Sequence, residues 1–137
     1  MSLDSIRQDI TTAVVAAAPS FTAWALNIEY DNRVLESRYE IVDPFLCVKV
    51  NLTDGYQADI SDNPVHRIMG QMLLGASVRE GEGSAKANAL LSHFYERLQR
   101  KTLGSVRTYM AMMGGAHPDK NRVEYQVIVP FWCDKTY

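Results

Sequence analysis

The chain has 137 residues, of which 47% are hydrophobic and 22% charged, a size and composition typical of one globular domain. We predict a single domain over residues 1–137 and no contact with a membrane, because no apolar run approaches the roughly 18 residues of a membrane span. Fourteen Lys and Arg against sixteen Asp and Glu give a net charge of −2, without the basic block that binding to duplex phosphates requires.

The first half of the chain combines a helical pattern with a strand pattern. Apolar residues recur at three- and four-residue steps from Leu3 to Ala17, and Pro19 follows, which predicts an amphipathic helix. Residues 20–39 break this pattern with spaced aromatic residues and a turn signal, so we expect irregular or extended structure there. Alternating hydrophobic residues predict a strand over 45–53, and the polar stretch that follows, up to residue 64, is expected to be a loop.

The second half predicts a strand, a helix and two further strands. Residues 65–78 alternate, with a face that comprises Ile68, Gly70, Met72, Leu74, Ala76 and Val78. A Gly-rich turn precedes a second helix, which we expect to begin at Ser84 and to end at Gly104. Strands are expected over 106–113 and 122–132, joined by a hairpin loop over 114–121.

The order of these elements predicts the fold class. It reads helix, irregular segment, strand, strand, helix, strand, strand, which is typical of an α+β fold. We expect a mostly antiparallel sheet of four to five strands with the two helices packed on one face.

The residues that most often carry chemistry give little signal. The two cysteines, Cys47 and Cys133, lie in apolar strand patterns and are expected to be buried reduced thiols. The three histidines stand in no ligand spacing with each other or with cysteine or acidic residues. We therefore predict no catalytic residue, no metal site and no cofactor.

Hydrophobic residues on the second face of the sheet point toward assembly instead. Met69, Leu73, Tyr109 and Met113 are expected on the face opposite the helices, where a lone two-layer domain would leave them exposed. Flexible methionines there serve either as adaptable core filling or as a pliable surface for a partner. Burial against another subunit would satisfy such a face.

Several segments, taken in order, resemble a known family. These are residues 28–32, the Gly-bearing strand 67–73, the Gly-rich turn 81–85 with the following helix, and the closing strand 127–131. Over roughly residues 20 to 132 the chain is similar to the phage tail terminator family, of the minor tail protein U type.

The resemblance implies a non-enzymatic structural protein that forms a hexameric ring. Such a ring caps the tail tube, stops its polymerisation and offers a surface to the head-completion or connector protein, and DNA passes its lumen without specific binding. The implied location is the tail or neck of the virion, after assembly in the bacterial host cytoplasm. A head-tail connector is the alternative, followed by a small ligand-binding or enzymatic domain. The residues that we expect at assembly interfaces are Arg33, Arg38, Met69, Arg79 and Tyr109.

Overall fold

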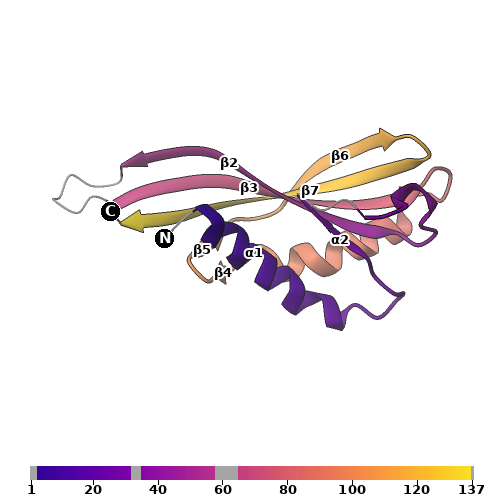
Figure 1. Ribbon diagram of the computed structural model, residues 1–137, viewed down its shortest axis with the longest axis horizontal. Coiled ribbons are helices and arrows are strands. Elements are labelled where there is room, and N and C mark those ends of the chain that lie inside the picture. The colour runs from indigo at the N-terminus through magenta and orange to yellow at the C-terminus, as the bar shows by residue number, and fades with distance from the viewer. Residues whose placement is uncertain (1–2, 32–34, 58–64, 137) are drawn as a thin grey trace.

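The computed structural model describes residues 3–31, 35–57 and 65–136, and it has an α+β fold (Figure 1). The helices are α1 (Leu3–Ala17) and α2 (Ala85–Leu98), with short 3-10 turns η1 (Ala18–Ser20) and η2 (Arg38–Glu40). The strands are β1 (Ile28–Tyr30), β2 (Phe45–Gln57), β3 (Val65–Arg79), β4 (Thr102–Leu103), β5 (Val106–Thr108), β6 (Met112–Asp119) and β7 (Arg122–Thr136).

One mostly antiparallel sheet contains all the strands of the described chain. Its order is β1-β2-β3-β7-β5-β4, and β6 also pairs with β7, further along the edge that β5 uses. Only the β1–β2 pair is parallel. The sheet has seven strands rather than the expected four to five. Three of them, β1, β4 and β5, have only two or three residues each, too few to produce a recognisable alternation in the sequence.

The hydrophobic core lies between the helices and one face of the sheet. Figure 1 shows α1 and α2 on the same side of the long strands. The 65–78 strand supplies Met72, Leu74, Ala76 and Val78 to this core, as its alternation predicted. The helices contribute mainly Ile6, Ile10, Val14, Leu90, Leu91, Phe94 and Leu98, which recur at helical spacing.

Three long strands extend beyond the helices. Strands β2, β3 and β7 have 13, 15 and 15 residues. Figure 1 shows their ends projecting past α1 on the side of the C terminus. In the described part of the chain, neither helix has the length and hydrophobicity that a membrane span requires.

Strand β2 continues to Gln57, into the stretch expected to be a loop from residue 54, and β7 continues to Thr136 beyond the predicted end at residue 132. Two further predicted boundaries are wrong for local reasons. Helix α2 ends at Leu98 rather than near Gly104, because Arg100 adopts a left-handed conformation (φ 53°) and its N–H bonds the Tyr109 carbonyl at 3.1 Å. Gly104 instead forms the turn between β4 and β5. The expected hairpin loop 114–121 is mostly strand: β6 continues to Asp119, and only residues 120–121 form the turn.

A polar segment covers part of the sheet face opposite the helices. Phe45 and Arg122 are both fully buried on this face, with the guanidinium 4.7 Å from the ring centroid. Arg122 Nε donates to Ser77 Oγ at 2.8 Å, Nη2 donates to the Ser77 carbonyl at 3.0 Å, and Nη1 donates to the carbonyl of Ile41. Segment 35–44 is thus fastened to β3 and β7, so this face is not as open as the sequence suggested.

Candidate functional site

Exposed hydrophobic side chains concentrate in one short segment that joins β5 to β6. Exposure is 46% for Tyr109, 55% for Met110, 49% for Met112 and 74% for Met113. These are four of the seven large hydrophobic residues that are exposed in the described chain. We call residues 109–113 the exposed hydrophobic segment. Exposed hydrophobic residues gathered along a sheet edge are typical of an interaction surface.

An interruption of the sheet produces this exposure. Thr108 lies opposite Phe131 and Met112 lies opposite Ile128, so three residues of one strand face two of the other, which is a β-bulge. Pro130 stands at this point and has no N–H to give to the ladder, although its carbonyl still accepts from Tyr109 N at 2.8 Å. The single expected strand 106–113 is therefore divided into β5 and β6.

The bulge also reverses which face each side chain occupies. One inserted residue moves the side chains that follow it to the other side of the sheet, until a second bulge between Met113 and Gly115 reverses the alternation again. Met113 consequently lies opposite Val127 and lines a small groove with Leu91 and Tyr95 of α2, on the helix side. The expectation that Met113 faces away from the helices is therefore wrong, whereas Met112, opposite Ile128, does face away.

Arg38, one of the expected interface residues, lies at the centre of an ion-pair cluster. Its Nε donates to Glu29 Oε2 at 2.9 Å, and its Nη1 donates to Asp119 and to Tyr39 Oη. Tyr39 in turn donates to Asp119 Oδ1 at 3.0 Å, and Glu29 Oε2 also accepts the Leu35 N–H at 3.0 Å. The cluster therefore links β1, η2 and the end of β6.

These contacts determine the charge states in the cluster. Burial opposes the charge of Arg38, but hydrogen bonds to Asp119, Tyr39 and Glu29 outweigh it and raise the pKa of the guanidinium. Partial burial would raise the pKa of Asp119, but the hydrogen bonds from Arg38 and Tyr39 lower it below its ordinary value. The pair is therefore held in its charged form.

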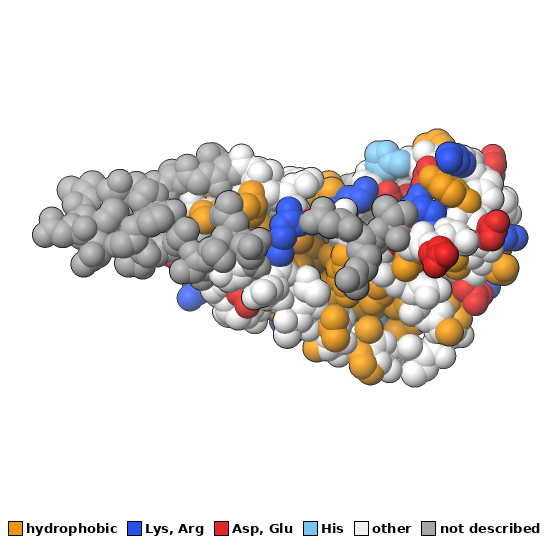
Figure 2. Space-filling model, in the orientation of Figure 1, with side chains coloured by type: hydrophobic (Ala, Val, Ile, Leu, Met, Phe, Trp, Pro, Cys, Tyr) orange, Lys and Arg blue, Asp and Glu red, His pale blue; other side chains and the backbone are white. Residues whose placement is uncertain are grey.

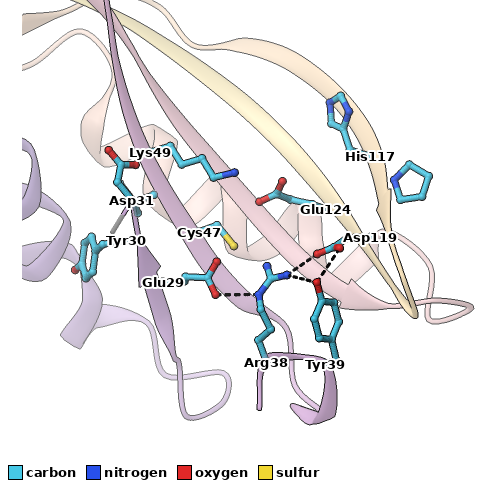
Figure 3. A pocket seen from close by; sticks show the side chains of 12 residues that line it. Glu29, Tyr30, Asp31, Arg38, Tyr39, Cys47, Lys49, His117, Asp119 and Glu124 are labelled. Carbon is cyan, nitrogen blue, oxygen red and sulfur yellow. Dashed lines mark hydrogen bonds and ion pairs between the residues drawn. The ribbon is translucent and has the colours of Figure 1, made fainter. Parts of the chain in front are cut away.

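The same cluster forms one wall of a polar pocket of about 540 Å³ (Figure 3). Lys49 of β2 and Glu124 of β7 line another side, and His117 lies at the β6 side. Glu124 accepts a hydrogen bond from Gln126 Nε2 at 2.9 Å and has no ion pair among the described residues. It can lie flat across the sheet because Gly75 below it has no side chain.

Cys47 lies at the floor of this pocket with 2% of its surface exposed. Burial raises the pKa of its thiol well above the ordinary range, and the negative charges of Glu124 and Glu29 raise it further. The thiol stays protonated at neutral pH and is a poor nucleophile. Cys47 and Cys133 are both buried and form no disulfide among the described residues, as the sequence predicted.

The other expected interface residues are scattered. Met69 is half-buried in the middle of β3, between its β2 neighbour and Trp132 of β7. Arg79 donates from Nη2 to the Glu40 carbonyl at 3.1 Å and so helps to hold segment 35–44. Tyr109 belongs to the exposed hydrophobic segment. Arg33 lies outside the described residues.

The cluster around Arg38 could not be read from the sequence. Glu29, Arg38 and Asp119 are 9 and 81 residues apart in sequence, so no local spacing relates them. In the described part of the chain, no group of three or more His, Cys, Asp or Glu side chains is placed to hold a metal ion.

Comparisons with known proteins establish the fold and nothing finer. No family model and no curated protein matches the chain. A solved structure whose name states no function matches with a TM-score of 0.71 at 17% identity, over 100% of this chain and 98% of its own. The α+β arrangement is therefore shared over almost the whole length of both chains.

Proposed function

We propose that the protein is a structural subunit of a phage tail terminator ring. The ring is hexameric, caps the tail tube, stops its polymerisation and presents a surface to the head-completion protein. It belongs to the tail or neck of the virion and lets DNA pass through its lumen. The proposal rests on the resemblance of the ordered segments between residues 20 and 132 and on the surface described above.

The observation that carries the proposal is the exposed hydrophobic segment. Covering side chains such as Met112 and Met113 with a neighbour stabilises an assembly by roughly 25 cal/mol for each Å² of apolar surface removed from water. When each subunit binds its neighbour through two different surfaces, the contacts are head-to-tail. Such contacts close into a ring when the rotation from one subunit to the next divides a full circle.

The ring and its position are tested together by adding the purified protein to tail tubes. Light scattering gives the mass of the protein alone and with tubes, and negative-stain microscopy locates it. We expect closed rings at tube ends. A monomer that ignores tubes but binds a portal or head preparation would replace the terminator with a head-tail connector.

A ligand-binding role is the second candidate, and the polar pocket is what favours it. Glu124, without an ion pair among the described residues, and Lys49 both line a hollow large enough for a small polar molecule. Thermal-shift screening of small charged molecules tests this role. A stabilisation that disappears in Glu124→Gln would favour the ligand-binding role over the ring.

A further inference from the structure

The two long edges of the sheet offer complementary strands. Strand β6 pairs only with β7 in the described structure, so its outer edge carries unpaired backbone groups. At the opposite end of the strand order, β1 covers β2 only from Leu46 to Val48. Residues 52–57 of β2 therefore also have an outer edge that no described strand pairs with.

A specific contact limits the open part of β2. Both Asp31 carboxylate oxygens accept the Val50 N–H at 3.1 Å, and Arg7 Nη2 donates to the Val50 carbonyl at 3.3 Å, while Arg7 and Asp31 also form an ion pair. These side chains take the place of a strand at Val50. A pairing strand can therefore engage β2 only beyond residue 50.

The open part of β6 is limited in a similar way. His117 Nε2 lies 3.1 Å from the Gly114 carbonyl, and Pro118 has no N–H to give to a neighbour. Pairing is therefore expected along residues 112–116. The two open stretches have similar lengths, five and six residues, and each contains a β-bulge, between Met113 and Gly115 in β6 and between Leu52 and Asp54 in β2.

The strand directions and the side-chain orientations at the two edges are also compatible with pairing between two copies. Each of the pairs β2–β3, β3–β7 and β7–β6 is antiparallel, so β6 runs opposite to β2 within one subunit. A second copy placed beside the first, with the same face of the sheet on the same side, would set its β6 antiparallel to β2. Leu52, 37% exposed, and Met113 then lie on the helix side of the continued sheet.

We propose that neighbouring subunits join by antiparallel pairing of residues 112–116 of β6 with residues 52–57 of β2 on a second copy of this chain. This inference rests on the proposed ring and names its contact surface. The contact is heterologous, since each subunit uses a different edge on each side. The exposed methionines of β6 become covered by the next subunit.

Disulfide cross-linking tests the pairing. Leu52→Cys protein is mixed with Met113→Cys or Ala116→Cys protein and then oxidised. Met113 and Ala116 lie opposite Val127 and Tyr125, on one face, because the β-bulge between Met113 and Gly115 inserts one residue, and they offer two registers. Facing side chains in an antiparallel pair have Cβ atoms about 4.5–5.5 Å apart, close enough for a disulfide. The native cysteines are buried and add little background. The matched control is Val42→Cys, because Val42 is 61% exposed but lies outside both edges.

A covalent dimer from an edge pair, and none from Leu52→Cys with Val42→Cys, is the expected result. Rings on tube ends without an edge cross-link would overturn this contact and leave the proposed function standing. An edge cross-link in open filaments would support the contact and overturn the ring. If neither rings nor an edge cross-link form, both proposals fail.

Discussion

Removing the guanidinium of Arg38 should destabilise the fold. The substitution Arg38→Met keeps much of the side-chain length but deletes the donors to Glu29, Tyr39 and Asp119. The Glu29 side chain, only 10% exposed, would then be left with the Leu35 N–H as its described partner. Breaking a fully buried ion pair costs about 3–5 kcal/mol, and the more exposed Asp119 contact adds less than about 1 kcal/mol. We expect a loss of about 2–4 kcal/mol, since Glu29 is not completely buried.

Urea unfolding measures this loss through the shift of the midpoint at constant slope. The matched control is Arg97→Met, because Arg97 is exposed and bonds only the His93 carbonyl of its own helix among the described contacts. It should change stability by less than about 0.5 kcal/mol. Adding Glu29→Gln to Arg38→Met should recover part of the loss. If Arg38→Met and Arg97→Met unfold at the same urea concentration, the argument about the buried carboxylate is wrong.

Three further outcomes follow from the same structure. The folded state holds the pKa of Asp119 below its ordinary value of 3.8. The ionised carboxylate therefore stabilises the fold above pH 3.8, and this stabilisation is lost as the pH falls through the lower folded pKa. Asp119→Asn should make the free energy of unfolding depend less on pH in the acid range. Gly70→Ala places a Cβ 2.5 Å from a backbone carbonyl of β2 and should cost about 1–3 kcal/mol by urea unfolding, whereas Gly75→Ala meets a flexible carboxylate and should cost less. In a variant that lacks Cys133, the Cys47 thiol should resist alkylation at neutral pH in the folded protein and react after unfolding. Equal alkylation rates in the folded and unfolded states would contradict the burial of Cys47.

These predictions bear on how an assembly defect is interpreted. Charge reversal at Arg38 would be a natural test of an interface residue chosen from the sequence. Its side chain is instead only 16% exposed and is engaged within its own subunit. A variant that fails to assemble would therefore first have to be shown to fold. Met112 and Met113, which are exposed, allow a cleaner test.

The sequence predicted what periodicity can encode. The helical spacing of α1 and α2 and the alternation of β3 follow from one buried face each, and the buried residues of β3 from Met72 to Val78 agree with that reading. The parallel pairing of β1 with β2 could not be foreseen, because three residues carry no period. The expected loop at 114–121 was wrong because its glycines and Pro118 are typical of turns, although an edge strand tolerates them.

Buried polar side chains were the other limit of sequence reasoning. Arg122 looks like an ordinary surface residue of an alternating strand, yet it is fully buried and satisfied by Ser77 and the Ile41 carbonyl. Its partners lie 45 and 81 residues away along the chain. Only the folded path of segment 35–44 brings them together, so no local pattern could have indicated this site.

Pro130 connects a single residue type to the surface that the proposed function uses. Because it cannot donate to the ladder, the strand opposite it bulges, and β5 is separated from β6. Met112 and Met113 take opposite faces as neighbouring strand residues do, and the bulge decides that Met112 faces away from the helices and Met113 toward them. Neither face of β6 is therefore purely polar. A strand that belongs to one subunit alone needs hydrophobic residues only on its covered side. Met112 is 49% exposed on the face away from the helices, and the proposed neighbour would cover part of it.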